Sequence, residues 1–420
     1  GPGGATGNGF DFIVDPIVVD ATTQPGYAGN PVIELDGSTL GAASGINGAT
    51  LRTDDSTIKG FSVVGFPDEG LEIDGSTGFG DNNTLQGNWV GIDAEGNVES
   101  NTEHQVMVSV DALGNQVGGA GANEGNVIGG APSGFNGVII RGNSDNNIVE
   151  GNLIGVLPDG TTAAANLGSG IRIETSSDNN RIGGTTPGAG NLISGNTGDG
   201  IQIDGTTDAT YTTPVTGTVI QGNYIGTDQS GTVALGNGDE GISIQNNVTA
   251  TTIGGSTTAA RNLIAGNAGA GILIQDGTAS TTVQGNYIGT DATGTADLGN
   301  GKLNGTGDKS GIRFWNAGIG NLVGGSAAGE ENLIAFNDEG GVVVSGTSAD
   351  VSIIGNRVHS NIGAGIDLNG DTVTANDADD TDSGPNSLQN YPVITSVVTN
   401  GIGSITVAGT LDTDGLNQDY

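Results

Sequence analysis

The sequence places carboxylate and guanidinium side chains at matching positions of a recurring pattern. Runs of the form Gly-Ile-x-Ile return along the chain, and position x and the position two residues later are often charged or polar. In an extended strand these two positions point to the same side, away from the isoleucines. Glu174 and Asp204 occupy the same position in two neighbouring runs, and Arg172 lies two residues before Glu174. If neighbouring runs stack, the two carboxylates become neighbours that can act as general acid and general base.

Two further residues belong to the same predicted group. Asp199 lies just before the run that carries Asp204, and Arg141 lies one run before Glu174. Arginine is suited to an anionic sugar because its planar guanidinium binds a carboxylate through two hydrogen bonds. An alternative without chemistry also fits, since arginine beside glutamate and aspartate forms ordinary surface ion pairs. If the chain is an enzyme, the predicted catalytic residues are Glu174, Asp204, Asp199, Arg172 and Arg141.

A tryptophan and an arginine share one strand further along the chain. Trp315 follows Arg313 by two residues, so both occupy outward positions of another run. An outward tryptophan offers a flat apolar surface on which a sugar ring can stack, and a neighbouring arginine can bind its substituents. The sequence therefore predicts Trp315 and Arg313 as carbohydrate-binding residues. The alternative is packing, in which the insert at residues 301–309 covers the tryptophan.

A dense acidic group lies near the C-terminal end. Asp377, Asp379, Asp380 and Asp382 fall within six residues and are followed by a glycine. Carboxylate oxygens are ligands of Ca²⁺, and like charges at this density repel one another unless a cation lies between them. The pattern is not an EF-hand, because that loop ends in a bidentate glutamate at its twelfth position. We expect these four aspartates to bind Ca²⁺, and an acidic linker without metal is the alternative.

The elements that position these side chains are short and repeated. The run at 241–244 returns at 271–274, and in each copy two more short apolar runs follow, bounded by glycine, asparagine or threonine. Such boundaries are typical of short strands joined by tight turns. A unit this small cannot bury its own apolar face, so it must stack on its neighbours. The sequence predicts an all-β, right-handed parallel β-helix of about 11 coils with three short strands per coil.

Two features of the turns recur with the coils. Every second coil carries an insert that begins with Asp-x-x-Gly, as at Asp93, Asp228 and Asp291, and we expect an ordinary turn there rather than a calcium site. The inserts fall at equivalent places, so they should emerge on one side of the stack. Asparagine recurs immediately before one apolar run of each coil, and we expect a hydrogen-bonded ladder of side-chain amides. Its members are Asn126, Asn152, Asn191, Asn223, Asn262, Asn286, Asn332 and Asn356.

Charge and composition exclude several classes of function. Forty-seven acidic residues face ten basic ones in a chain of 420, a formal net charge of −37. The phosphates of nucleic acids and anionic membrane surfaces would repel such a chain, so we expect neither as a partner. No apolar run is long enough to insert into a membrane. The absence of cysteine decides nothing about the redox compartment. The acidic surface favours a salty or calcium-rich exterior.

Several stretches resemble proteins of known architecture. The stretches 23–37, 222–228 and 384–392 are similar to parts of the repeat regions of large secreted bacterial surface proteins. The three-strand coil with asparagine at a fixed turn resembles the pectate-lyase-like parallel β-helix superfamily. The resemblance covers roughly residues 11–410 and implies the fold. The signatures of the pectin hydrolases, lyases and alginate epimerases of that superfamily are not recognisable here, so it implies no particular activity.

The expected function follows from this resemblance and the surface residues. We expect a secreted or cell-surface β-helical scaffold or adhesive stalk of a larger surface protein, with carbohydrate binding left open. Its partners would be polysaccharides or neighbouring cell-surface components. The competing hypothesis is a polysaccharide-processing enzyme, namely a lyase, hydrolase or epimerase that acts on acidic glycans.

The expected boundaries divide the chain into five parts. Residues 1–9 are expected to be a flexible start with a remnant of protease cleavage at Gly1-Pro2. Residues 10–47 form an N-terminal cap and the first strands, and 48–370 form the β-helix. Residues 371–386 form the acidic loop. Residues 387–420 form a β-hairpin that caps the rod and begins a further, truncated segment.

Overall fold

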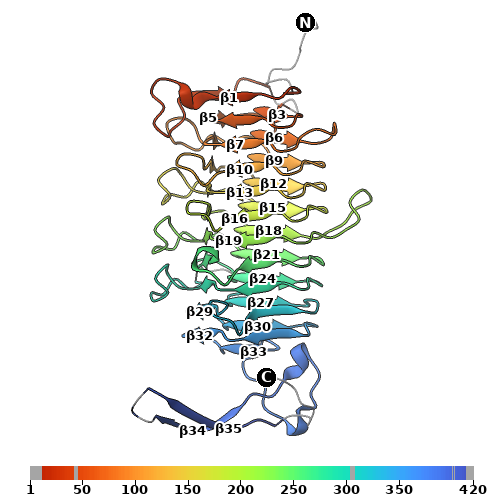
Figure 1. Ribbon diagram of the computed structural model, residues 1–420, viewed down its shortest axis with the longest axis vertical. Helices are drawn as coiled ribbons and strands as arrows, with labels where there is room; N and C mark the ends of the chain where they lie inside the picture. Colours follow the sequence, from red (N-terminus) through yellow and green to blue (C-terminus); the bar gives the residue numbers. More distant parts are fainter. Residues whose placement is uncertain (1–11, 42–45, 303–307, 400, 402, 413–420) are drawn as a thin grey trace, which may run out of the picture.

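The computed structural model is a rod built from three parallel β-sheets of 11 strands each (Figure 1). It describes residues 12–41, 46–302, 308–399, 401 and 403–412. The expected flexible start at 1–9 lies outside these residues. Each turn of the chain adds one strand to each sheet, so strands three apart in sequence are hydrogen-bonded neighbours. Connections between parallel strands follow the right-handed path. The predicted right-handed parallel β-helix of about 11 coils is confirmed.

The three sheets are named A, B and C. Sheet A contains β3 (Ala49–Leu51), β6 (Leu71–Asp74), β9 (Val106–Ser109), β12 (Val138–Arg141), β15 (Ile171–Glu174), β18 (Ile201–Asp204), β21 (Ile242–Gln245), β24 (Ile272–Gln275), β27 (Ile312–Trp315), β30 (Val342–Ser345) and β33 (Ile366–Leu368). Sheet B contains β1 (Val18–Asp20), β4 (Thr57–Lys59), β7 (Thr84–Gln86), β10 (Gln116–Gly118), β13 (Ile148–Glu150), β16 (Arg181–Gly183), β19 (Val219–Gln221), β22 (Thr252–Gly254), β25 (Thr282–Gln284), β28 (Asn321–Gly324) and β31 (Val351–Ile354). Sheet C contains β2 (Ile33–Asp36), β5 (Phe61–Val64), β8 (Trp89–Val90), β11 (Val127–Ile128), β14 (Leu153–Ile154), β17 (Leu192–Ile193), β20 (Tyr224–Ile225), β23 (Leu263–Ile264), β26 (Tyr287–Ile288), β29 (Leu333–Ala335) and β32 (Arg357–His359).

Stacked columns of apolar side chains from all three sheets fill the inside of the rod. Ile201, Ile242 and Ile272 are in register on consecutive strands of sheet A, and each is fully buried. The same stacking of Ile, Val and Leu continues through sheets B and C as one hydrophobic cluster. Because the inside of each strand is fixed by this core, every second residue of sheet A must face outward. The core therefore positions the outward side chains coil by coil.

Asparagine side chains stack at the turn between sheets B and C and form the turn column. Its members are Asn88, Asn126, Asn152, Asn191, Asn223, Asn262, Asn286, Asn332 and Asn356. In each step the amide of one asparagine donates to the side-chain oxygen of the next, as Asn223 Nδ2 does to Asn262 Oδ1 at 3.0 Å. The backbone N–H of Asn223 donates to the same oxygen at 3.0 Å. The predicted ladder is confirmed, and Asn88 extends it by one coil.

The inserts of alternate coils are local turns that pack on one another. The Asp228 carboxylate accepts hydrogen bonds from Thr232 N at 3.0 Å and Val233 N at 3.1 Å inside its own insert. Backbone N–H groups of Gln229 and Ala292 donate to carbonyls of the preceding inserts. The Asp-x-x-Gly segments are therefore turns that stack along one side, as expected. Their carboxylates accept hydrogen bonds from backbone N–H groups of the same loop.

The C-terminal end of the rod is closed by a short helical turn. The 3₁₀ turn η4 (Pro385–Leu388) places Asn386 against the free edge of the last coil. Val351 N donates to Asn386 Oδ1 at 2.8 Å, and Asn386 Nδ2 donates to Val351 O at 3.0 Å. The hairpin β34 (Val393–Thr399) and β35 (Ile405–Thr410) is antiparallel and exposed along its whole length. Figure 1 shows the hairpin lying away from the last coil. The prediction that the hairpin caps the rod is therefore wrong. The edge strand β31 needs partners for its backbone groups, and Asn386 supplies them at Val351.

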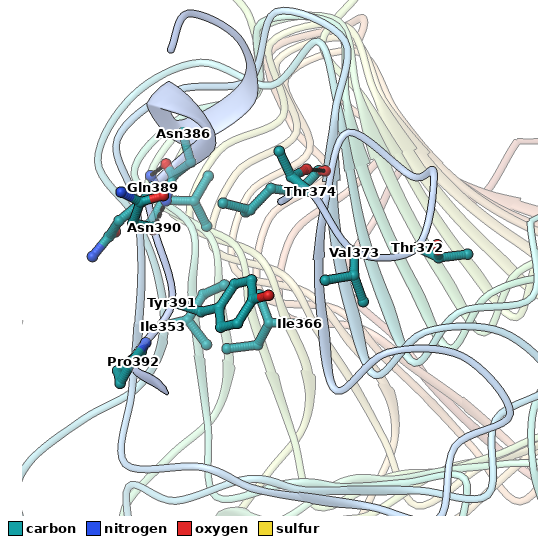
Figure 2. A pocket seen from close by; sticks show the side chains of 12 residues that line it. Ile353, Ile366, Thr372, Val373, Thr374, Asn386, Gln389, Asn390, Tyr391 and Pro392 are labelled. Carbon is teal, nitrogen blue, oxygen red and sulfur yellow. Dashed lines mark hydrogen bonds between the residues drawn. The ribbon is translucent and has the colours of Figure 1, made fainter. Parts of the chain in front are cut away.

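An apolar pocket of about 510 Å³ lies between the last coil and this closing segment. Ile353 and Ile366 form its wall from the rod, and Tyr391 lies beside both of them in Figure 2. The other 3₁₀ turns are η1 (Ala21–Thr23), η2 (Thr258–Ala260) and η3 (Ala378–Asp380). Within the described ranges, no helix has the length and apolarity that crossing a bilayer requires.

Candidate functional site

The outward face of sheet A carries the charged residues that the sequence singled out. Glu174 on β15 and Asp204 on β18 are register partners, as predicted from their equivalent positions. Arg172 lies on the same face of β15, two residues before Glu174. The side chains of Glu174 and Asp204 are mostly buried, although the sheet face is open. The repeat therefore does bring the predicted pair together.

These two carboxylates are held in an ion-pair network. Arg172 Nε lies 2.6 Å from Glu174 Oε2, and Arg172 Nη2 lies 3.0 Å from Asp204 Oδ2. Arg141 Nε lies farther away, 3.6 Å from Glu174 Oε1. One guanidinium therefore bridges both carboxylates. This arrangement matches the ion-pair alternative, in which charge-assisted hydrogen bonds hold both carboxylates in place.

Asp204 is also saturated with hydrogen bonds. Burial raises its pKa, but hydrogen bonds from Thr206, Asn246 and Gln245 outweigh the burial and leave the pKa below its ordinary value. Thr206 Oγ1 donates at 2.6 Å and Asn246 Nδ2 at 2.8 Å. Asp204 is therefore ionised at neutral pH and firmly positioned.

Asp199 belongs to a different group, which we call the acidic triad: Asp199, Asp239 and Glu240. Oxygen atoms from the three carboxyl groups all lie within 4.8 Å of one another. Asp199 and Glu240 are 6% and 8% exposed, and Asp239 lies at the surface. Glu240 N donates to Asp199 Oδ1 at 3.1 Å and joins the two coils.

The acidic triad holds a proton at neutral pH. Burial, followed by repulsion from Asp199 and Asp239, raises the pKa of Glu240 to about 10. Burial also raises the pKa of Asp199 to about 6, although its hydrogen bond with Glu240 and the nearby Arg172 oppose the rise. A carboxylic acid thus lies beside a carboxylate, which is the pairing that general acid–base chemistry uses.

An open pocket of about 440 Å³ adjoins the acidic triad on the same face. It is lined by Glu240, Leu273, Gln275, Asp308, Arg313, Trp315 and Glu339. Trp315 is 43% exposed, so the described part of the 301–309 insert does not cover it. The Arg313 guanidinium lies 5.1 Å from the centre of the Trp315 ring and forms an ion pair with Asp308. The predicted pair of Arg313 and Trp315 therefore meets in a pocket.

A row of polar contacts connects the ion-pair network to this pocket, and we call it the polar strip. Gln245 Nε2 donates to Asp204 Oδ2 at 3.2 Å, and Gln275 Nε2 donates to Gln245 Oε1 at 3.0 Å. Gln275 is in turn the register partner of Trp315. From Glu174 to Trp315 the strip crosses five coils, a length of about 19 Å at the usual strand spacing.

The sequence reasoning missed Asp239, Glu240, Asp308 and Glu339. It examined the two outward positions of each strand, whereas these residues lie just before the strands begin. An Asp-Glu pair next to the glycine of the repeat would have been the signal, and it occurs at 68–69 as well as at 239–240. There, oxygens of Asp68, Glu69 and Glu103 also lie within 4.8 Å of one another. Burial raises the pKa of Glu69 to about 9, with repulsion from Asp68 as the next cause.

The acidic loop is organised by its own hydrogen bonds. Thr381 Oγ1 donates to Asp377 Oδ2 at 2.9 Å, and Asn390 N donates to Asp380 Oδ1 at 2.8 Å. Asp377 Oδ1 is buried and lacks a partner among the described residues, so it has a free lone pair for a cation. Ca²⁺ takes carboxylate oxygens as ligands, and such oxygens are offered by Asp377, Asp379, Asp380 and Asp382. Calcium binding here stays a prediction.

Comparison with known proteins identifies the fold. No protein-family model matches the sequence, and no curated protein sequence matches it significantly. Among solved structures, the Dettilon tailspike protein aligns with a TM-score of 0.51 and 16% identity, over 93% of this chain and 67% of that chain. The periplasmic alginate epimerase AlgG aligns at 12% identity and a TM-score of 0.38, over 77% of this chain and 60% of that chain.

The mannuronan C-5 epimerase AlgE4 A-module of Azotobacter vinelandii aligns at 14% identity and a TM-score of 0.33, over 87% and 90% of the two chains. The alignment spans only 50% to 60% of the two alginate epimerase structures that head the comparison. At these identities the likeness concerns architecture. By its fold, the chain is a right-handed parallel β-helix protein.

Proposed function

We propose that this β-helix is a secreted or cell-surface scaffold that binds polysaccharide along the outward face of sheet A. The observation that carries the proposal is the polar strip, which ends at the exposed Trp315 in an open pocket. A sugar ring can stack on the indole, while Arg313, Gln275 and Glu240 offer hydrogen-bonding groups to its hydroxyls. The solved structures that share the fold include alginate epimerases and an alginate lyase, which agrees with this class of ligand.

The shape of the site supports a chain rather than a single sugar. The strip runs along the rod axis for about 19 Å, and its donors and acceptors are fixed coil by coil. A rigid row of this kind loses little conformational entropy when it binds. At the far end of the strip Arg172 is already paired with Glu174 and Asp204, whereas the side chain of Arg141 is 46% exposed and its Nε lies 3.6 Å from Glu174 Oε1. Arg141 is therefore the cation that a ligand can reach there, in a protein that is otherwise strongly acidic. An acidic glycan would place a carboxylate there.

Tryptophan fluorescence provides the test. The protein has two tryptophans, of which Trp89 is 5% exposed and Trp315 is 43% exposed, so a bound sugar should change the emission of Trp315. We expect oligosaccharides of uronate polymers to bind, and Trp315→Ala to weaken binding about tenfold, in line with the loss of an aromatic stack. Phe79→Ala is the matched control, because Phe79 is an exposed aromatic outside the pocket. If no glycan in a panel of acidic and neutral polymers binds the wild-type protein, the proposal fails.

A polysaccharide-processing activity is the second candidate, and the acidic triad favours it. Glu240 bears a proton beside the ionisable Asp199 at the edge of the same pocket, as a general acid and base would. The protein would be established as an enzyme if it turns over a uronate polymer and Glu240→Gln abolishes this turnover without loss of glycan binding. Turnover abolished by Glu174→Gln or Asp204→Asn, with binding intact, would place the chemistry on the ion-pair network.

A further inference from the structure

We propose that the long turn after β18 completes a second saccharide subsite, in which Tyr211 and Arg141 bind the uronate residue of a glycan chain. This turn spans residues 205–218, whereas the equivalent turn after β15 spans 175–180. It is the longest of the turns between sheets A and B that the structure describes, and Figure 1 shows it projecting beyond its neighbours. The inference rests on the proposed function and concerns the end of the polar strip opposite Trp315.

The long turn folds back over the preceding coils and is fixed there. Ser176, in the turn after β15, donates from its Oγ to Thr213 O at 2.6 Å and accepts from Thr213 Oγ1 at 3.0 Å. Val215 is fully buried and belongs to the hydrophobic core of the rod. Asp208 Oδ1 accepts from the backbone N–H of Tyr211 at 2.8 Å and closes the tip of the turn. Because the turn already has this shape, little conformational entropy is lost when a ligand binds.

A glycine lets Tyr211 lie directly against the coil of β12. Gly142 has a φ of 71°, and a Cβ added there would lie 2.9 Å from Tyr211 Oη. Gly142 follows Arg141, the last residue of β12, so the phenol lies at the strand end that carries the guanidinium. Among the described residues the Tyr211 hydroxyl has no hydrogen-bond partner. Burial, followed by repulsion from Asp111 and Asp208, raises the pKa of Tyr211, so its hydroxyl stays a donor at neutral pH.

The Arg141 guanidinium also has unused donors. It donates no hydrogen bond to a described residue, and its contact with Glu174 is the long one of 3.6 Å. Arg172, by contrast, lies within 3.0 Å of carboxylate oxygens on both of its partners. A guanidinium with free donors binds a carboxylate through two parallel hydrogen bonds. Arg141 can therefore bind the carboxylate of a sugar while Tyr211 donates to the same sugar.

Two aspartates near Arg141 favour a sugar acid over a simple anion. Hydrogen bonds from the backbone of Tyr211 and Thr210 lower the pKa of Asp208, and the charge of Arg141 adds to this. Asp111 Oδ1 accepts from the side chain of the neighbouring Asn143. Neither aspartate forms an ion pair with Arg141 in the described part of the chain. Both carboxylates have lone pairs left for sugar hydroxyls, and they would repel an anion that has no hydroxyl to donate.

Calorimetric titration of the full chain tests the subsite with two probes, an oligomer of a uronic acid and an oligomer of the corresponding neutral hexose. Arg141→Gln should weaken binding of the uronate oligomer about tenfold and leave the neutral oligomer nearly unchanged, because only the uronate loses a charge-assisted pair of hydrogen bonds. Tyr211→Phe should weaken binding of the uronate oligomer about fivefold, in line with the loss of one hydrogen bond. Arg357→Gln and Tyr391→Phe are the matched controls, because both residues are exposed and lie outside sheet A.

The outcomes separate this inference from the proposed function. If Trp315→Ala weakens binding of the uronate oligomer but Arg141→Gln and Tyr211→Phe, both melting cooperatively like the wild type, do not, the protein binds glycans and the second subsite is overturned. If Arg141→Gln weakens the uronate and the neutral oligomer equally, the assignment of a uronate is overturned. If the wild-type protein binds neither oligomer, the inference falls together with the proposed function.

Discussion

The turn column and the acidic triad both bury polar side chains, and they satisfy them in opposite ways. In the turn column Asn262 is fully buried, donates to Ile220 O at 2.9 Å and to Asn286 Oδ1 at 3.0 Å, and accepts from Asn223. In the acidic triad Glu240 is almost as buried and faces two other carboxyl groups. A buried amide that meets both donors and acceptors stabilises the fold, whereas a buried carboxyl group whose hydrogen-bond partners are other carboxyl groups loses stability when it ionises, and this suggests a functional constraint. Within the same repeat, the turn column thus serves the fold, whereas the acidic triad is a candidate for function.

The largest expected effect comes from breaking the satisfied region. Asn262→Ala should lower the free energy of unfolding by about 1–3 kcal/mol, because it removes the acceptor of the Asn223 backbone N–H and one donor to the Ile220 carbonyl in the interior. Denaturant unfolding measures the loss. Asn97→Ala is the control and should be nearly neutral, since Asn97 is exposed and outside the turn column. Equal losses for the two variants would show that the ladder does not hold the coils together.

In the acidic triad, by contrast, replacing the carboxyl group of Glu240 by an amide should stabilise the protein. The pKa of Glu240 is raised from 4.5 to about 10, so the folded state holds a proton that the unfolded chain releases above pH 4.5. Wild-type stability should therefore fall as the pH rises from about 5 towards 10. Glu240→Gln keeps the donor at every pH, so we expect a flatter profile and a gain of about 1 kcal/mol at pH 8.

Unfolding in chelator-treated buffer at pH 5, 7 and 9 measures this difference. Glu339→Gln removes the same kind of carboxyl group outside the triad and should leave the slope with pH unchanged. A wild-type profile that is flat over this range, or one that Glu240→Gln does not flatten, would show that the pKa of Glu240 is not raised in the folded protein.

These two regions also differ in how far the sequence predicts them. The turn column follows from the repeat, since each asparagine precedes an apolar run and stacking then sets its neighbours. The stacking of Glu174 on Asp204 follows for the same reason. Asp199 was predicted, but its partners Asp239 and Glu240 were missed because they lie in a turn before the strand, where no alternation of period two assigns a direction to a side chain. The role of Arg172 depends on its side-chain conformation, and the cap at Asn386 lies outside the repeat, so neither could be read from periodicity.

A second column of stacked turn residues changes from asparagine to threonine, and we expect a smaller effect on stability there. Asn83, Asn115, Asn147 and Asn180 stack in successive coils and share hydrogen bonds. Thr218, Thr251 and Thr281 take the equivalent positions in the next coils, and their hydroxyls are buried without a partner among the described residues. The column then resumes at Asn321, whose side-chain oxygen accepts from the backbone N–H of Thr281 at 3.0 Å. The threonine stretch is thus an unsatisfied interval within a satisfied column.

Thr251→Asn should therefore extend the ladder into this interval. The new amide oxygen would lie where it can accept from the backbone N–H of Thr218, as Asn321 does for Thr281, and we expect a gain of about 0.5–1 kcal/mol. Denaturant unfolding measures the change against Thr185→Asn, an exposed position with no column. A loss of stability at Thr251 alone would mean that the turn has no room for the larger side chain, and that the threonines are retained for packing.

The smallest expected effect concerns the acidic loop, where the carboxylates are half-buried or exposed and some already accept local hydrogen bonds. The hypothesis is that Asp377, Asp379, Asp380 and Asp382 bind Ca²⁺, motivated by their density and by the buried, unpartnered Oδ1 of Asp377. Exposed sites of this kind bind at about 10⁻⁴–10⁻³ M, so calcium at a concentration equal to the Kd should stabilise the fold by only about 0.4 kcal/mol. Millimolar calcium should raise the melting temperature slightly more than sodium chloride of equal ionic strength, and Asp379→Asn with Asp382→Asn should abolish the excess. If calcium does no more than matched salt, the four aspartates form an acidic linker without a metal site.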